Sequence, residues 1–210
     1  MPGGMTETRF WLIRHAIVEE NARTKIYGTM DVELCPHSLA AQVPMYQALA
    51  RRLPRPARWL ASPLSRTQRT AAAIFAAGYP EQALTIEPEL IELAFGDWQG
   101  LPHDEITPLL RQKAHAFWLL SGEERPPGGE SMADGIARLG GALERLARQH
   151  AGHDVIAVSH GGAIRAAVAH ALRISADTAL HLSVENISLT RLDRTPLGWR
   201  VVCVNELPGV

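Results

Sequence analysis

The sequence predicts a single α/β domain, a three-layer α/β/α sandwich with a mostly parallel central sheet. Three short apolar runs each end abruptly in polar residues, which is typical of strands buried on both faces. Segments with helical spacing lie between these runs, and strands that alternate with helices form parallel sheets covered on both sides. No linker, repeat or low-complexity segment interrupts the 210 residues, so we expect one domain over 1–210, with residues 1–8 flexible.

The first strand is expected at residues 10–13, where Phe-Trp-Leu-Ile is continuously apolar. Residues 16–36 are polar and show no clear period, which predicts a long loop, and such loops in compact domains are often functional. Residues 38–53 place apolar side chains on one side at helical spacing, so one helix is expected there.

The second strand is expected at residues 57–61, and a helix start directly follows it. Ser62 can cap a helix and Pro63 fits the first helical position, where its missing N–H costs nothing. A short strand at 83–86 and a structured loop over 89–100 come next.

The second half of the chain begins with an expected helix over residues 103–120. The run Arg-Pro-Pro-Gly-Gly at 125–129 then breaks the chain. Ser131 and Asp134 are spaced as a capping box, which predicts a helix that continues to about residue 150.

The last clear buried strand is expected at residues 154–159, and a His-Gly-Gly turn leads from it into a helix over 163–172. Two further strands, at 186–192 and 199–204, are joined by a Pro/Gly turn and predict a hairpin.

Composition excludes several classes of protein. The net charge of −1 gives no electrostatic reason to expect nucleic acid or an acidic membrane as partner. No apolar stretch approaches the roughly 20 residues that span a bilayer, and no signal peptide is apparent, so a cytoplasmic protein is expected. Cys35 and Cys203 lie far apart and argue against both a disulfide framework and a thiolate metal site.

Chemistry-bearing residues gather at the ends of three predicted strands. Arg14 and His15 follow the first, Arg66 lies just after the second, and His160 follows the third. In open α/β sheets, ligands bind beyond the carboxyl ends of the strands, so these side chains are expected to converge. Two guanidiniums suit a phosphoryl group, one imidazole can attack phosphorus and the other can donate to its oxygens. Gly161, at a helix start, adds backbone N–H donors for an anion.

Five blocks of the sequence together resemble the signature blocks of the histidine phosphatase superfamily, in the branch of cofactor-dependent phosphoglycerate mutases and small phosphatases. They follow the family's order and cover roughly residues 9–172: Arg14-His15, Ser62 to Ala71, Leu90 to Gly100, Pro127 to Ser131, and Ser159 to Gly162. The resemblance implies a phosphoglycerate mutase-like fold and a phosphatase that hydrolyses small-molecule phosphate monoesters.

The resemblance also implies roles for the converging residues. His15 would be the nucleophile that forms a phosphohistidine, and Arg14, Arg66 and His160 would complete the phosphate pocket. No metal and no other cofactor is implied.

Three further positions take their roles from the resemblance alone. Glu92 matches the glutamate that protonates the leaving alkoxide and then acts as base for water. Asn21 matches an asparagine that contacts phosphate, and Gly28 lies where the family's first loop approaches the substrate.

The residues directly after His15 depart from the family's usual Arg-His-Gly-Glu-Thr. Ala16 keeps a small side chain, whereas Ile17 and Val18 replace polar residues by branched apolar ones. We therefore expect an apolar pocket mouth, formed by Ile17, Tyr27, Phe95 and Trp98.

Phosphoglycerate mutase activity is the nearest competing hypothesis within the family. Mutases hold a bisphosphorylated substrate with extra basic residues ahead of the second histidine. The only cations in the corresponding short stretch here are Arg111, Lys113 and Arg125, which favours hydrolysis. Arg23 and Lys25 in the first loop could still hold a second anionic group.

Three more hypotheses are compatible with parts of the sequence. The stretch from Tyr27 to Asp31 resembles a Tyr-Gly-x-x-Asp pattern of α-ribazole phosphatases. A non-catalytic binding protein would have lost a core residue, and none is lost. A metal-dependent hydrolase would show metal-ligand spacing such as HxH or HExxH, and the nine histidines show none. The expected partner is a small-molecule phosphate ester, and the oligomeric state, a homodimer included, stays open.

Overall fold

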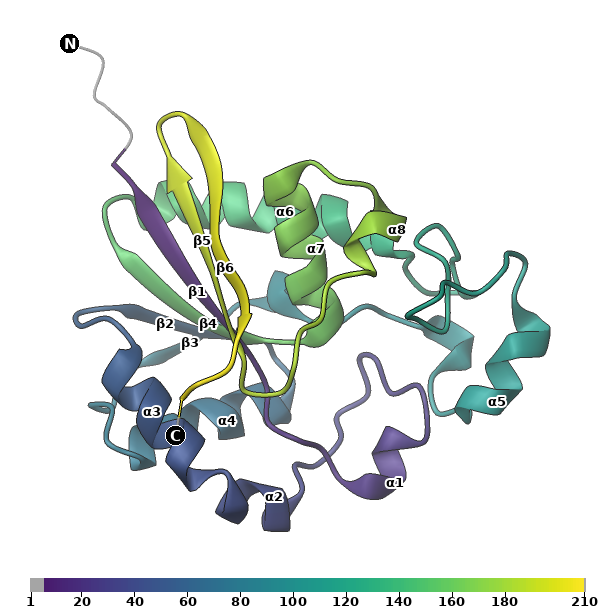
Figure 1. The fold of residues 1–210 in the computed structure, drawn as a ribbon, viewed down its shortest axis with the longest axis horizontal. Helices are drawn as coiled ribbons and strands as arrows, with labels where there is room; N and C mark the ends of the chain where they lie inside the picture. The colour runs from purple at the N-terminus through teal and green to yellow at the C-terminus, as the bar shows by residue number, and fades with distance from the viewer. Residues whose placement is uncertain (1–5, 210) are drawn as a thin grey trace.

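Six strands form one sheet in the order β3-β2-β4-β1-β5-β6 in the computed structural model, which describes residues 6–209 (Figure 1). Their bounds are β1 Thr8–Arg14, β2 Arg58–Ala61, β3 Leu84–Ile86, β4 Asp154–Ser159, β5 Leu189–Thr195 and β6 Gly198–Glu206. The first four run parallel, whereas β5 and β6 form an antiparallel hairpin whose first strand pairs with β1. The predicted α/β domain with a mostly parallel sheet is confirmed.

The central strands are buried on both faces because their side chains alternate between two apolar clusters. Phe10 and Leu12 of β1 pack into the cluster that includes side chains of α6 (Met132–Gln149) and α7 (Gly161–Leu172). Trp11 and Ile13 point the other way, into a cluster with α3 (Val43–Arg52) and α4 (Ser65–Ala76). The sheet is therefore the middle of three layers.

Helices cover both faces of the sheet, as Figure 1 shows. On one side lie α6 and α7, with the short α8 (Ala176–Ala179) beyond them; on the other lie α2 (Pro36–Ala41), α3 (Val43–Arg52) and α4 (Ser65–Ala76). No helix among residues 6–209 is both long enough and apolar enough to cross a membrane.

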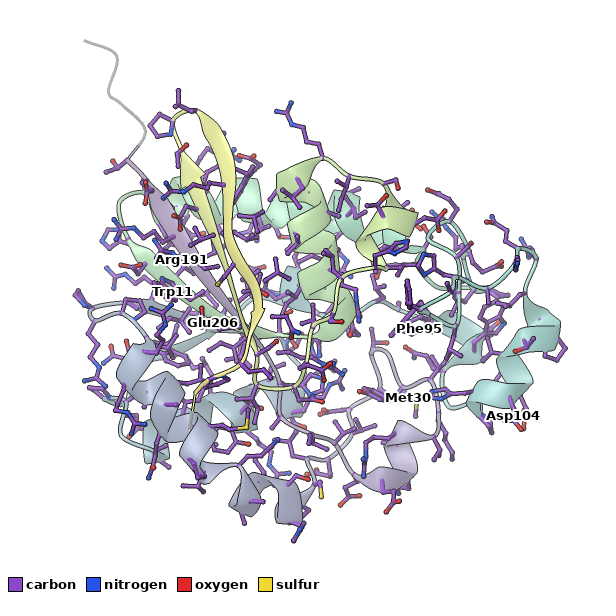
Figure 2. All side chains as sticks on the ribbon, in the orientation of Figure 1. Trp11, Met30, Phe95, Asp104, Arg191 and Glu206 are labelled. Carbon is purple, nitrogen blue, oxygen red and sulfur yellow. The ribbon has the colours of Figure 1, made fainter. Side chains whose placement is uncertain are left out.

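Trp11 of β1 is paired with Arg191 of β5 in the sheet. The Arg191 guanidinium stacks on the Trp11 indole, 4.7 Å from its centroid. Figure 2 shows both beside Glu206 near β1, β5 and β6, whereas Met30 and Phe95 lie on the opposite side.

The single helix expected over residues 38–53 is wrong, because two helices occupy this stretch. α2 ends at Ala41, Gln42 forms a turn, and α3 begins at Val43. Pro44 explains the break: its nitrogen has no hydrogen to donate to the carbonyl four residues back, and its ring crowds that carbonyl.

The helix expected over 103–120 is also wrong beyond its first turn. α5 (His103–Ile106) is followed by a 3-10 turn (Thr107–Leu109) and then by irregular chain. Pro108 interrupts the helical hydrogen bonds. The buried carboxylate of Glu124 instead accepts two backbone N–H groups of this stretch, at 3.1 and 2.8 Å.

Three smaller expectations also differ from the structure. Thr8 is buried in β1, so the predicted flexibility does not extend to it; residues 1–5 lie outside the described residues. The long loop contains one helical turn, α1 (Glu20–Arg23). Helix α7 begins at Gly161, two residues before the expected start, whereas the capping box of α6 is confirmed.

Candidate active site

The three strand-end motifs meet at one edge of the sheet. β1 and β4 are parallel neighbours in the register Arg14 with Ser159, so His15 and His160 leave the sheet side by side. Their rings are edge to face, with centroids 5.2 Å apart. β2 pairs with the other side of β4 and brings Arg66, in the first turn of α4, to the same place.

Among residues 6–209, one ring nitrogen of His15 makes a hydrogen bond and the other makes none. Nδ1 lies 2.7 Å from the carbonyl oxygen of Ala16, so Nδ1 carries the hydrogen and donates it. Nε2 then holds the lone pair. Burial, reinforced by the positive charges of Arg66 and Arg14, holds the pKa of His15 well below its ordinary 6.5. The imidazole is therefore neutral at physiological pH, with Nε2 available as a nucleophile.

His160 is fixed by a bond at each nitrogen. Nε of Arg66 donates to Nδ1 at 3.3 Å, and Nε2 lies 2.7 Å from Oγ of Ser62, so Nε2 is the protonated nitrogen. Burial and the neighbouring charge of Arg66 hold the pKa of His160 well below its usual range. Ser62 therefore orients a histidine, whereas the sequence predicted it as a helix cap; α4 begins at Ser65 with Leu64 at the cap position.

The guanidinium of Arg66 is fully buried and firmly held. Besides the bond to His160, it donates to the carbonyl oxygens of Gly28 at 2.6 Å and Met30 at 2.7 Å. Gly28 has a left-handed φ of +38°, and a Cβ there would stand 2.6 Å from a side-chain atom of Phe95. The contribution of Gly28 is thus a backbone carbonyl in a turn with no room for a side chain.

Arg14 reaches the cavity with a free donor. One terminal nitrogen donates to the carbonyl oxygen of Val184 at 2.5 Å, while the buried Nε has no partner among residues 6–209. An unpaired buried N–H costs free energy, so Nε of Arg14 is available to donate a hydrogen bond to an oxygen of a bound ligand.

Glu92 occupies the start of α7. One carboxylate oxygen accepts the N–H groups of Leu93 and Ala163, both at 3.0 Å, and the other accepts the N–H of Gly162 at 3.1 Å. A carboxylate is well placed at a helix N-terminus. The helix-start amides that the sequence predicted for phosphate are thus partly taken by Glu92, which they fix in position.

A cavity of about 250 Å³ lies in front of these groups. Its lining combines cations, one carboxylate and apolar side chains: Arg14, Arg23, Lys25, Ile26, Tyr27, Gly28, Glu92, Phe95, His103, Trp118, Leu119, Leu120, Gly161, Gly162 and Arg165. His15, Arg66 and His160 do not line it but lie buried, each at most 1% exposed.

The pocket mouth expected from the sequence is present only in part. Tyr27 and Phe95 line the cavity, whereas Ile17 and Trp98 do not, and Trp98 is buried in the apolar core. Asn21 is exposed on α1 and is also absent from the lining, so the structure does not bring it to the other site residues.

Sequence reasoning missed three residues of the site. Asn186 donates from its side-chain amide to the carbonyl oxygens of His15, at 2.7 Å, and Ala16, at 3.3 Å, and thereby holds the turn after β1. Arg165 and Trp118 line the cavity together. Arg165 lies four residues after Gly161, a helical spacing that places both on one face, and this signal was available in the sequence.

A family profile and several known proteins match the sequence of this chain. A family profile described as the histidine phosphatase superfamily (branch 1) matches residues 10–207. A glucosyl-3-phosphoglycerate phosphatase of Mycolicibacterium vanbaalenii is 31% identical over 82% of this chain and 78% of its own length. A probable phosphoglycerate mutase of Yersinia pestis is 30% identical over 90% of this chain and 86% of its own length.

Solved structures agree with the sequence relatives. A mycobacterial glucosyl-3-phosphoglycerate phosphatase superposes with a TM-score of 0.79 at 26% identity, covering 95% of this chain and 99% of its own. A putative α-ribazole-5'-P phosphatase of Escherichia coli reaches a TM-score of 0.75 at 23% identity, covering 97% and 98%.

Proposed function

This chain belongs to the histidine phosphatase superfamily, and we propose that it hydrolyses phosphate monoesters of small molecules through a phosphohistidine formed on His15. One observation carries the proposal. The Nδ1–H of His15 is engaged by the Ala16 carbonyl, which leaves the Nε2 lone pair free in a neutral ring beside Arg14 and Arg66.

The reaction divides into two displacements at phosphorus. The Nε2 lone pair of His15 attacks phosphorus, the bond to the ester oxygen breaks, and Glu92 acts as the general acid that passes a proton to the leaving oxygen. Water then attacks phosphorus while Glu92 takes one of its protons, and the P–N bond breaks, which frees phosphate and His15. Arg14 and Arg66 neutralise the charge on the transferring oxygens.

The backbone of the site supports both steps. The Ala16 carbonyl keeps accepting from Nδ1 while Nε2 carries the phosphoryl group, and so stabilises the positive imidazole ring. Three backbone N–H groups hold Glu92 at the cavity wall, where a leaving group would stand.

The positions of the cations in the segment between Gly100 and Pro126 favour hydrolysis over the mutase reaction. Arg111, Lys113 and Arg125, which lie in the segment where mutases carry extra basic residues, are all absent from the cavity lining. Arg23 and Lys25 of the first loop do line it and are the cations there that could hold a second anionic group. Asp31, on which the α-ribazole hypothesis depends, accepts from Ser65 at the start of α4. The likeness to the putative α-ribazole-5'-P phosphatase is one of fold alone.

The same proposal extends to the partner of the protein and to its compartment in the cell. We propose a small-molecule phosphate ester as the only class of partner, with neither nucleic acid nor membrane, in the cytoplasm. No group of three or more metal-ligating side chains within residues 6–209 could hold a metal ion, and the proposed steps use none.

Turnover of para-nitrophenyl phosphate tests the proposal. The wild-type enzyme should release phosphate in the presence of EDTA, and His15→Ala should be inactive. Strong inhibition by EDTA, or undiminished turnover by the variant, would reject the proposed mechanism.

A further inference from the structure

One buried hydroxyl holds the turn that follows β1. Oγ1 of Thr70, in the middle of α4, accepts the N–H of Ala16 at 2.9 Å and donates to the carbonyl oxygen of Arg66 at 2.7 Å. Thr70 and Ala16 are both fully buried. A hydroxyl has a single hydrogen and the Arg66 carbonyl takes it, so toward Ala16 the oxygen acts as an acceptor. The turn after β1 is therefore tied to the helix that carries the Arg66 guanidinium.

The peptide group between His15 and Ala16 is held from both sides. Its N–H donates to Thr70, and its carbonyl oxygen accepts from Nδ2 of Asn186 at 2.7 Å. The same Nδ2 lies 3.3 Å from the carbonyl oxygen of Ala16. Because the peptide group is planar, it cannot rotate without losing one of these bonds. Thr70 and Asn186 together fix the direction in which the backbone continues through Ala16.

The direction of the Ala16 carbonyl determines which nitrogen of His15 carries the hydrogen. In a neutral imidazole one nitrogen is a donor and the other an acceptor, and the partner of the first sets the tautomer. The Ala16 oxygen can only accept, so it keeps the hydrogen on Nδ1, 2.7 Å away. No other hydrogen bond to the His15 ring exists among residues 6–209. The state of the nucleophile therefore depends on this one carbonyl.

We propose that Thr70 and Asn186 are positioning residues that set the tautomer of His15. They hold the peptide group after it so that the Ala16 carbonyl faces Nδ1, and this keeps Nε2 unprotonated for attack on phosphorus. Neither side chain lines the cavity, so both act through the backbone. The inference rests on the proposed phosphatase function and adds the residues that prepare its nucleophile.

Nitrogen NMR of the histidine-labelled enzyme tests the inference on the resting protein. The chemical shifts of the ring nitrogens report which one carries the hydrogen, and His15 is identified among the nine histidines by the signals that His15→Ala lacks. In the wild type Nδ1 should be protonated. Thr70→Val keeps the shape of the side chain but leaves the Ala16 N–H without its acceptor. A second state with the hydrogen on Nε2, the tautomer that free histidine prefers, should then appear.

Single-turnover kinetics measure the consequence for the reaction. In Thr70→Val the rate of phosphoenzyme formation from para-nitrophenyl phosphate should fall about tenfold or more, because a ring protonated on Nε2 cannot attack. Thr70→Ser keeps the hydroxyl and should restore the tautomer and most of the rate. Asn186→Ala should shift both readouts in the direction of Thr70→Val. Since Asn186 is only half-buried, this variant decides the matter if Thr70→Val does not fold.

Thr8→Val is the matched control for the loss of a buried hydroxyl. Thr8 is buried and donates to the backbone carbonyl of Ala147 at 3.0 Å, but it lies at the opposite end of β1 from His15. Its loss should lower the stability, as the loss of the Thr70 hydroxyl does, while the tautomer of His15 and the rate stay those of the wild type. Equal shifts in Thr8→Val and Thr70→Val would trace the effect to general destabilisation and overturn the inference.

The remaining outcomes separate this inference from the proposed function. A His15 ring that stays protonated on Nδ1 in folded Thr70→Val overturns the positioning role. Turnover of para-nitrophenyl phosphate by the wild type, lost in His15→Ala, would still leave the phosphatase proposal standing. A wild-type protein that releases no phosphate from any ester overturns the proposed function, and this inference with it.

Discussion

The Nε2–H of His160 donates to Oγ of Ser62 across 2.7 Å, and this bond sets the tautomer of the second histidine of the site. The same hydroxyl accepts the N–H of Leu64 at 3.2 Å, so Ser62 links the end of β2 to the histidine after β4. His160 in turn accepts from Arg66 through Nδ1, which directs the guanidinium.

Replacing Ser62 by alanine should therefore reduce turnover without removing a group that touches the substrate. Ser62→Ala leaves the buried N–H of His160 unpaired, which costs about 1–3 kcal/mol, and frees the ring to rotate away from Arg66. We expect kcat for para-nitrophenyl phosphate to fall about tenfold or more, with Ser62→Thr restoring part of it. Equal activity of Ser62→Ala and wild type would show that the bond does not position His160.

The two buried histidines predict a stability that falls as the solution becomes mildly acidic. His15 and His160 are neutral in the folded state with pKa values held well below 6.5, mainly by burial, whereas in the unfolded chain they bind protons near pH 6.5. Below that pH the unfolded state binds more protons, so the free energy of unfolding drops by about 1.4 kcal/mol per pH unit for each histidine.

Urea unfolding between pH 7.5 and about 5 measures this slope. His160→Gln removes one of the two groups and should show a shallower fall than wild type, whatever its absolute stability. Burial also lowers the pKa of His150. Because His150 is present in both proteins, its contribution to the pH dependence of stability cancels in the comparison. Parallel curves for the two proteins would contradict the buried neutral state of His160.

Gly162 is predicted to keep Glu92 in place. A Cβ on Gly162 would stand 2.5 Å from a carboxylate oxygen of Glu92, so Gly162→Ala must displace that carboxylate from its N–H donors. We expect at least a tenfold loss of kcat in Gly162→Ala. Gly141→Ala in α6 is the control: nothing lies within 4 Å of its Cβ, so activity should stay unchanged and stability should rise by about 0.4–1 kcal/mol. An active Gly162→Ala would mean that Glu92 does not need its present position.

The acid role of Glu92 predicts a dependence on the leaving group. Glu92→Gln cannot protonate the departing oxygen, so alkyl phosphates, whose alkoxides leave poorly, should be slowed far more than para-nitrophenyl phosphate. The ratio of the two rate losses, measured in single-turnover experiments, isolates the first displacement. Equal slowing of both esters would reject the general-acid role.

The residues at the strand ends could be predicted from the sequence because local patterns determine them. One buried strand is followed at once by Arg14-His15 and another by His160. If the two strands pair in parallel, both histidines come to the same edge of the sheet, and β1 and β4 do pair in this way. The register is set by the alternation of apolar side chains between the two cores.

Other parts of the site depend on contacts that the sequence pattern does not encode. Asn186 and the carbonyl of Leu182 come from the irregular connection between α8 and β5, which hydrogen bonds tie to His15 and Arg165. The sequence predicts a helix over residues 103–120, yet Pro108 and the buried Glu124 carboxylate direct the chain after α5 elsewhere. This path brings Trp118 to Arg165.

The phosphohistidine on His15 is the central claim, and trapping the phosphoenzyme tests it most directly. Mixing the enzyme with a phosphate ester and quenching in base within milliseconds should yield a protein heavier by one phosphoryl group, attached at His15 and lost on acid treatment. His15→Ala should show no such species, and Glu92→Gln should accumulate more of it than wild type, because hydrolysis of the P–N bond needs the base. Active turnover with no phosphoryl group on His15 at any time, in both the wild type and Glu92→Gln, would contradict the account.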